Sequence, residues 1–197
     1  MDIVIIATPI HHHAEQTIES LESGKHVLCE QTAAYTVGQC APIVEAVKRT
    51  GRTYMMAENY CYFHYIRQWH DLVRQGKLGG IFYAEAEHVH EIEDLPVDRA
   101  TGAYHWRHER PPIWYCAQCL GPLLMLMDDR IVQACGSHGG HGTSEYYLIR
   151  DFLDAVETGS RPPIDVRRAM DFTVPGIVAH DSAMGDGNWQ DVPLFDW

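Results

Sequence analysis

Short apolar runs and helical patterns alternate through residues 1–60, and this order constrains the fold more than any other feature of the chain. Three runs have the length and composition of strands: 2–10, 25–30 and 53–57. The two intervals between them place apolar residues at helical spacing: 14–23 and 36–50. Continuous apolar runs are typical of strands covered on both faces, and a β-α-β-α-β order favours parallel strands joined by right-handed crossovers. The sequence therefore predicts half of an α/β domain.

The remaining residues, 61–197, are predicted to form a reduced α+β region. Helical spacing predicts four helices: 63–75, 120–127, 144–157 and 165–184, the last of which is interrupted by Pro175. Two segments have the pattern of strands: 81–90, whose second half alternates between two faces, and 130–135. Polar or glycine-rich composition predicts loops at 91–112 and 137–142. With one long and one short strand, this region can hold only a small sheet.

The chain is acidic, and its net negative charge bears on the kinds of molecule that it can bind. Its 197 residues include 15 Lys plus Arg and 27 Asp plus Glu, a net charge of −12. Such a balance disfavours nucleic acids and anionic membranes as partners. No apolar stretch approaches the roughly 20 residues of a membrane span, and no basic leader follows Met1, so we expect a cytoplasmic protein. The six cysteines are spread through apolar segments, which is typical of reduced thiols.

The loops that follow the three predicted strands hold the candidates for ligand binding, because ligands of open α/β sheets lie outside the carboxyl ends of the strands. The candidates are Thr8, Pro9, His11 and His13 after the first strand, Glu30 at the end of the second, and Asn59, Tyr60 and Tyr62 after the third. Each residue type also has a structural alternative. Histidines can be solvated in a loop, a carboxylate can cap a helix, and aromatic rings often pack in a core.

Two clusters have the spacing of metal ligands. His88 and His90 lie two residues apart on one strand face, where they can bind a metal, flank a polyol or form a polar sheet surface. Cys116 and Cys119 form a C-x-x-C pair. Two further histidines can complete a set of four ligands: His138 and His141. A single C-x-x-C pair recurs by chance, so we interpret these cysteines as small buried residues and predict no bound metal.

Several segments resemble the Gfo/Idh/MocA family of sugar-directed oxidoreductases, and together they cover nearly the whole chain. Residues 6–15, in which spaced histidines follow Thr-Pro, are similar to the turn after the family's fourth strand. Residues 24–32 are similar to its Gly-Lys-His-Val-x-x-Glu-Lys-Pro signature. Four further segments also resemble the family: 57–60, 74–79, 111–122 and 140–146. The last two are similar to the branch that includes NAD-dependent glycosidases.

The resemblance implies a fold class, a cofactor and a set of site residues. The fold class is α/β, with a partial Rossmann-like parallel sheet over 1–60 joined to a reduced α+β domain for substrate and oligomerisation over 61–197. The implied reaction transfers a hydride between a sugar or polyol and NAD or NADP, in a homo-oligomer. The implied site residues are Tyr115, His141 and His90 for catalysis, Thr8, Pro9, His11, His13, Glu30 and Asn59 for the cofactor, and Tyr60, Tyr62 and Gln118 for the substrate.

Three departures from the family pattern bear on activity. The chain contains no G-x-G-x-x-G turn, the element whose backbone N–H groups cradle a pyrophosphate. Gln31-Thr32 stand where the signature has Lys-Pro. Ala117-Gln118 stand where the related branch has Thr-His, and glutamine cannot replace histidine as a general base. We therefore expect impaired turnover.

Three alternatives remain open at the level of sequence. One is a cofactor-free paralogue that binds sugars or other subunits. Another is a metal-assisted sugar lyase or isomerase that uses four histidines: His88, His90, His138 and His141. The last is that the chain, which begins in the middle of a nucleotide-binding pattern, is a piece of a longer enzyme.

Overall fold

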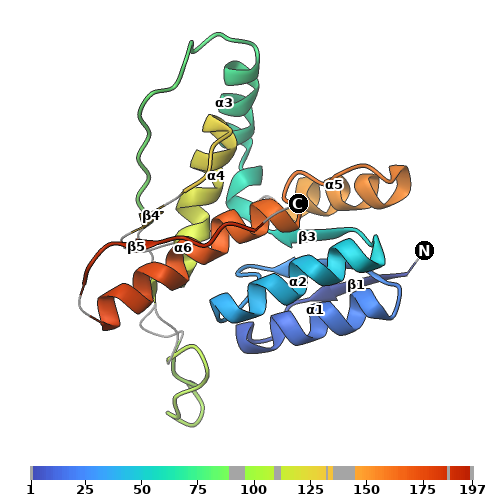
Figure 1. Cartoon of the computed structure of the whole chain (residues 1–197), viewed down its shortest axis with the longest axis vertical. Helices are drawn as coiled ribbons and strands as arrows, with labels where there is room; N and C mark the ends of the chain where they lie inside the picture. Colours follow the sequence, from blue (N-terminus) through green and yellow to red (C-terminus); the bar gives the residue numbers. More distant parts are fainter. Residues whose placement is uncertain are drawn as a thin grey trace.

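The computed structural model of this chain describes residues 2–88, 96–108, 112–131, 133–134, 145–185 and 187–195. Its N-terminal part has the expected order of elements: β1 (Ile3–Ile6), α1 (His13–Glu22), β2 (His26–Glu30), α2 (Val37–Thr50) and β3 (Tyr54–Ala57). The strands are parallel in the order β1-β2-β3, and α1 and α2 pack side by side (Figure 1). The predicted half of an α/β domain is confirmed.

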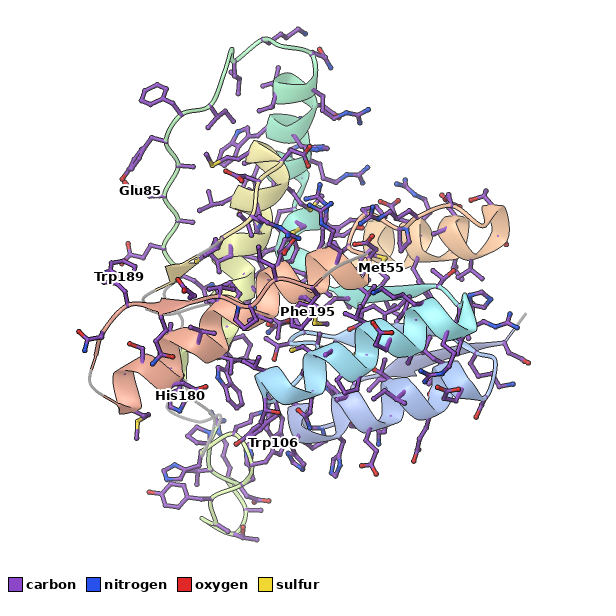
Figure 2. The ribbon with its side chains drawn as sticks, in the orientation of Figure 1. Met55, Glu85, Trp106, His180, Trp189 and Phe195 are labelled. Atoms are coloured by element: carbon purple, nitrogen blue, oxygen red, sulfur yellow. The ribbon has the colours of Figure 1, made fainter. Side chains whose placement is uncertain are left out.

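Burial of the strands follows their position in the sheet. Val27 and Cys29 of the central strand β2 are fully buried, as is Met55 of β3, which lies in the interior in Figure 2. Such burial explains the continuous apolar runs, because a strand covered on both faces has no polar side. In β1, at the edge of the sheet, 64% of Ile5 is exposed.

Local chemistry sets the bounds of α2. Before its first turn, the side-chain oxygen of Gln39 accepts hydrogen bonds from the N–H groups of Tyr35 (2.9 Å) and Thr36 (3.0 Å). At the other end, Gly51 has φ +61° and its N–H donates to the carbonyl of Val47 at 3.0 Å. Glycine adopts this left-handed conformation without steric cost, so the helix ends there.

The rest of the described chain is mostly helical. Three 3-10 turns link longer elements: η1 (Ile10–His12), η2 (Asn59–Tyr62) and η3 (Pro112–Cys116). Four helices follow the sheet: α3 (His64–Arg74), α4 (Ala117–Met127), α5 (Glu145–Thr158) and α6 (Val166–Met184). Two short strands pair antiparallel: β4 (Gln133–Ala134) and β5 (Gln190–Asp191). None of the described helices combines the length and apolar character that crossing a bilayer requires.

Helix α6 joins the C-terminal region to the sheet. It packs against α2 and β3. Just before it, the carbonyl of Ile164 accepts the N–H of Met56 at 3.0 Å, and within it the hydroxyl of Thr173 accepts the N–H of Ala33 at 3.2 Å. The expected interruption at Pro175 is wrong, because α6 is continuous. Phe172, Val174 and Ile177 around it are all buried, and that burial outweighs the hydrogen bond that a proline cannot donate.

The strand expected at 81–90 is also wrong over residues 81–88, which run extended without a partner strand in the described part of the chain. Phe82 is 96% exposed, Tyr83 is 68% exposed, and Glu85 projects from this long segment in Figure 2. Its alternation fits a half-buried strand, but a strand forms only where a neighbour accepts and donates its backbone hydrogen bonds. Residues 89 and 90 lie outside the described residues.

Smaller differences concern the bounds of several elements. The strand expected at 2–10 is confined to β1, and η1 begins at Ile10. Helix α4 begins at Ala117 rather than at 120, because η3 runs directly into it. The strand expected at 130–135 is described only as β4. The loop expected at 137–142 lies outside the described residues.

Candidate functional site

The carboxyl ends of the three strands meet at one edge of the sheet. The register pairs Ile6 with Cys29 and Glu30 with Ala57. The loops that follow β1, β2 and β3 therefore start side by side, as a ligand site of an open α/β sheet requires. We call this region the sheet edge.

Aromatic side chains from distant segments line the sheet edge. The ring of Tyr35, after β2, meets the ring of Trp114 in η3 edge-on, with centroids 4.3 Å apart, and lies 6.4 Å from His11. Trp114 is buried and also faces His180 of α6 at 6.2 Å. Figure 2 shows His180 at the same end of the molecule as Trp106. The sequence interpretation missed Tyr35, Trp114 and His180, because no local pattern brings these segments together.

His13 holds two loops of the sheet edge together. It is fully buried, and its ring nitrogens form hydrogen bonds with the backbone carbonyls of Thr32 (Nδ1, 2.7 Å) and Thr8 (Nε2, 2.8 Å). The hydroxyl of Thr8 donates to Gln16 at 2.8 Å. The side chains of His13 and Thr8 thus shape the loop, whereas His11 is exposed and can reach a ligand.

The end of β2 presents both an exposed and a buried polar side chain. Glu30 is exposed, and Gln31 after it is buried. The side-chain oxygen of Gln31 has no hydrogen-bond partner among the described residues. A buried acceptor in this state costs free energy, so a ligand that donates to it would be stabilised.

Glu58, after β3, is the most perturbed acid of the site, and the sequence interpretation gave it no role. It is fully buried, and one carboxyl oxygen accepts the N–H of Tyr60 at 3.1 Å. The other has no hydrogen-bond partner in the described part of the chain. Burial raises the pKa of Glu58 to about 8, so the group is mostly protonated at neutral pH. Its position directly after a strand of the sheet was the available signal.

Tyr60 and Tyr62 were predicted together but have different surroundings. The ring of Tyr60 lies edge-on to His88, with centroids 5.0 Å apart, and burial followed by the charge of Glu58 raises its pKa to about 12. Tyr62 is buried and lines a pocket with residues of α3 and α5, among them Asp151. Burial, and then Asp151, raise the pKa of Tyr62. Asn59, beside them in η2, is also buried.

Tyr115 and Gln118 come to the site on η3 and α4. Tyr115 is half-buried, and its hydroxyl oxygen accepts a hydrogen bond from Arg107 at 3.2 Å. Gln118 is buried in the first turn of α4, the helix that packs against η2. His90 and His141, the other two predicted catalytic residues, lie outside the described residues.

The candidate metal ligands gain no support from their surroundings. Burial raises the pKa of the Cys116 thiol to about 12 and that of Cys119 to about 11, so both are protonated at neutral pH. Within the described ranges, no three His, Cys, Asp or Glu side chains are grouped as a metal site. His138, which belonged to both metal hypotheses, lies outside those ranges with His141.

Comparison with known proteins identifies the N-terminal part. Residues 1–58 match the Gfo/Idh/MocA oxidoreductase family, NAD-binding Rossmann fold. Over 132 residues the chain is 37% identical to a glycosyl hydrolase family 109 protein of Shewanella sp. (strain W3-18-1) and 36% identical to one of Shewanella baltica (strain OS155 / ATCC BAA-1091). The match covers 65% of this chain and 29% of each relative, so the chain spans less than a third of their length.

Solved structures share the whole described fold. An oxidoreductase domain protein from Kribbella flavida has a TM-score of 0.82 at 16% identity, over 98% of this chain and 80% of that one. Levoglucosan dehydrogenase in complex with NADH and levoglucosan has a TM-score of 0.77 at 16% identity, over 99% of this chain and 81% of that one. At such identities the likeness establishes the fold, and the predicted α/β Rossmann-like class is confirmed.

Proposed function

We propose that the chain, whose residues 1–58 match the Gfo/Idh/MocA family of oxidoreductases, binds NAD or NADP at the sheet edge and exchanges a hydride with a sugar or polyol. The observation that carries the proposal is the contact of Tyr35 with Trp114, at 4.3 Å between ring centroids. It holds η3, and with it Tyr115, against the loop after β2. Tyr115, which we propose as the proton-transfer group, would thereby lie close to the edge where a ligand of such a sheet binds.

The residues of the sheet edge fit the nicotinamide half of such a cofactor. The exposed carboxylate of Glu30 can accept hydrogen bonds from ribose hydroxyls, and the exposed ring of His11 can donate to the ligand. The buried oxygen of Gln31, which lacks a hydrogen-bond partner in the described chain, can accept from the nicotinamide carboxamide. Bound nicotinamide supplies the hydride acceptor or donor. Thr8, Pro9 and His13 shape the loop around it.

Tyr115 is the residue that we propose for proton transfer to or from the substrate hydroxyl. The guanidinium of Arg107 donates to its oxygen and also lies over the Trp106 ring, 4.5 Å from the centroid. A positive charge at a phenol oxygen stabilises that oxygen when it gives up its proton. Asn59, Tyr60, Tyr62 and Gln118 are proposed to position the substrate. His90 and His141 remain further candidates for proton transfer.

Cofactor titration and hydride transfer test this function. Calorimetric titration with NADH and NADPH should give binding, and a panel of polyols and keto-sugars should change the absorbance of the reduced cofactor. In Tyr115→Phe, kcat should fall by about 100-fold while the Kd of the cofactor stays unchanged. The matched control is Tyr83→Phe, which removes a hydroxyl from an exposed segment and should have wild-type kcat. Absence of both cofactor binding and turnover would overturn the proposal.

A subunit-interaction role is the second candidate, supported by the exposed edge of β1. Ile5 is 64% exposed, and β1 pairs with β2 alone within the described chain. An apolar edge strand of this kind favours pairing with another chain. We propose a cytoplasmic homo-oligomer, and sedimentation of wild type and Ile5→Lys tests it: the variant should dissociate. An oligomer that binds no cofactor would favour this role over catalysis.

A further inference from the structure

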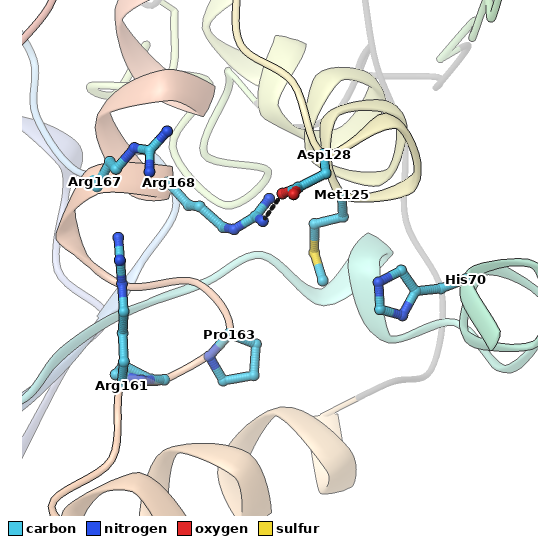
Figure 3. A pocket seen from close by; sticks show the side chains of 8 residues that line it. His70, Met125, Asp128, Arg161, Pro163, Arg167 and Arg168 are labelled. Carbon is cyan, nitrogen blue, oxygen red and sulfur yellow. Dashed lines mark hydrogen bonds and ion pairs between the residues drawn. The ribbon is translucent and has the colours of Figure 1, made fainter. Parts of the chain in front are cut away.

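A pocket rich in arginine lies beside the C-terminal end of α4. It has a volume of about 400 Å³, and its walls come from α3, α4, the segment before α6 and the start of α6 (Figure 3). The lining residues are His70, Met125, Asp128, Arg161, Pro162, Pro163, Arg167 and Arg168. Gln118 in the first turn of α4 and Asp128 just after its last turn are about 15 Å apart, at 1.5 Å per residue. The pocket that Tyr62 lines adjoins the arginine pocket and shares His70, Met125 and Pro163 with it.

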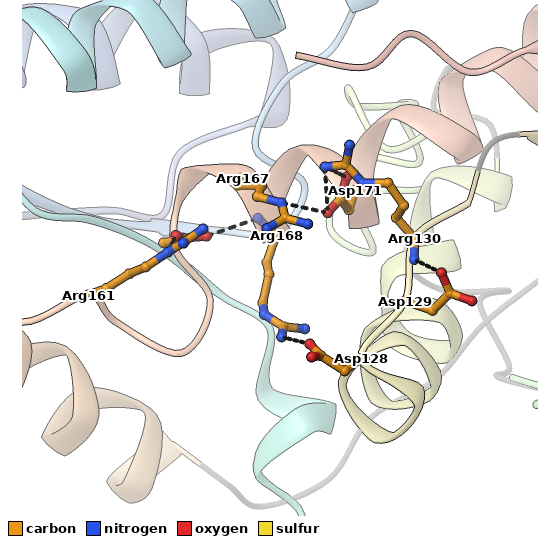
Figure 4. A network of polar contacts seen from close by, with 8 residues as sticks. Asp128, Asp129, Arg130, Arg161, Arg167, Arg168 and Asp171 are labelled. Atoms are coloured by element: carbon orange, nitrogen blue, oxygen red, sulfur yellow. Dashed lines mark hydrogen bonds and ion pairs between the residues drawn. The ribbon is translucent and has the colours of Figure 1, made fainter. Parts of the chain in front are cut away.

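The lining of the arginine pocket includes three arginines and one carboxylate, and two further carboxylates that are not part of the lining pair with these arginines (Figure 4). Arg168 donates to Asp128 at 2.7 Å, and Arg161 forms an ion pair with Asp165. Asp171 is shared: it lies 3.1 Å from a guanidinium nitrogen of Arg130 and 3.9 Å from the Nε of Arg167. The ion pair of Arg167 with Asp171 is therefore long, and Arg130 competes for the same carboxylate.

Three further observations describe the electrostatic surroundings of the arginines in the pocket. The Nε of Arg167 is buried and has no hydrogen-bond partner among the described residues. Arg167 and Arg168 occupy the first turn of α6, which contains no acidic residue, although the helix dipole disfavours cations there. Burial, followed by the charges of Arg167 and Arg168, lowers the pKa of Arg161.

We propose that the arginine pocket binds a phosphate group, either as inorganic phosphate or at the end of a small phosphate ester. Guanidinium groups match phosphate oxygens with paired N–H donors, and three arginines line this pocket. The carboxylate of Asp128 occupies Arg168 in the structure, but its side chain is 87% exposed and can turn to solvent when an anion arrives. Pro162 and Pro163 restrict the backbone of the segment that carries Arg161.

Binding of inorganic phosphate tests the proposal. Calorimetry and thermal denaturation of the full chain should detect phosphate but not chloride at equal ionic strength. Arg161→Gln and Arg168→Gln should each weaken phosphate binding by about tenfold or more. The matched control is Arg49→Gln, which removes the same charge from an exposed pair on α2 and should bind phosphate as the wild type does.

Asp128→Asn is the decisive variant, because loss of the competing carboxylate should strengthen phosphate binding several-fold. Asparagine tolerates the left-handed backbone at this position, where φ is +49°, so denaturation should report a folded protein. A variant that is merely damaged would bind less. Equal stabilisation by phosphate and chloride, or weaker binding in Asp128→Asn, would overturn the proposal.

The same titration distinguishes the two sources of the phosphate group. Glucose 6-phosphate, inorganic phosphate and glucose are compared on one protein preparation. Tighter binding of the ester supports a phosphorylated metabolite, and equal or tighter binding of inorganic phosphate supports the free ion. Binding of glucose as tight as that of its phosphate would contradict a phosphate site.

Discussion

The sheet edge and the arginine pocket stabilise polar groups in different ways. At the sheet edge, Glu58 is buried with a single described hydrogen bond, and it is neutral because it holds a proton. In and beside the arginine pocket, groups of opposite charge face one another, as Arg168 faces Asp128 and Arg130 faces Asp171. The sheet edge should therefore respond to pH, and the arginine pocket to anions and to salt.

The largest expected effect is the pH dependence that Glu58 gives to stability. Its pKa is about 8 in the folded protein and near the ordinary 4.5 when unfolded, so between these values the folded state holds more protons. The contribution of Glu58 to the free energy of unfolding is then fully present below about pH 4.5 and is lost as the pH rises through 8. From pH 5.5 to 7.5 we expect a loss of about 3 kcal/mol, measured by urea denaturation.

Glu58→Gln should remove most of this slope, because the amide keeps the shape of the side chain and cannot ionise. Glu19→Gln, on the exposed surface of α1, is the matched control and should follow the wild-type curve. If Glu58→Gln retains the full pH dependence of stability, Glu58 is not neutralised by a proton, and the contrast between the sheet edge and the arginine pocket does not hold.

The sheet was predictable from sequence because its signals are local. The apolar residues Val27, Leu28 and Cys29 are buried in β2, and Gly51 ends α2 by its own backbone preference. The strand prediction for residues 81–88 was wrong because strand formation is not decided locally. The alternation of these residues is local, but a strand needs a partner, and no pattern within the segment says whether one is present. The helix interruption predicted at Pro175 was wrong because burial against distant residues outweighs the tendency of proline to break a helix.

Residues of the candidate site could be predicted from sequence only where they directly follow the carboxyl end of a strand. His11 and Glu30 followed from the carboxyl ends of β1 and β2. The contact of Tyr35 with Trp114 joins segments that tertiary packing alone brings together. Likewise, the protonated state of Glu58 depends on its burial beneath α4, which the order of residues does not reveal.

The next largest effect concerns Gly121, where α4 packs on Glu58. A Cβ at this position would lie 2.9 Å from the sulfur of Cys61 and 3.2 Å from the Cγ of Glu58. Gly121→Ala should therefore lower the free energy of unfolding by about 2 kcal/mol through overpacking.

Gly38→Ala is the control for that measurement, because its Cβ would meet only Thr36, at 3.9 Å. Gly38→Ala should leave the free energy of unfolding unchanged or raise it by up to about 1 kcal/mol, since alanine favours the helical conformation more than glycine does. Equal effects of the two substitutions would argue against close packing of α4 on the sheet edge.

Asp165→Ala tests the ion pairs around the arginine pocket and should lower the free energy of unfolding by about 1 kcal/mol. Asp165 precedes α6, and its carboxylate accepts the N–H of Arg168 at 3.0 Å while it pairs with Arg161. Asp181→Ala removes an exposed carboxylate from the same helix and should leave the denaturation midpoint unchanged. A loss as large in Asp181→Ala would assign the effect to net charge rather than to the N-terminus of α6.

The smallest expected effect is that of Asp128→Asn on stability in the absence of phosphate. Its ion pair with Arg168 is short, at 2.7 Å, but the carboxylate is 87% exposed, and exposed pairs contribute about 0.5 kcal/mol or less. Denaturation in low and high salt should give nearly the same midpoint as the wild type. A loss of more than about 1 kcal/mol would mean that Asp128 holds α4 to α6. The arginine pocket would then be a structural ion-pair network, and its cations would no longer be available to an anion.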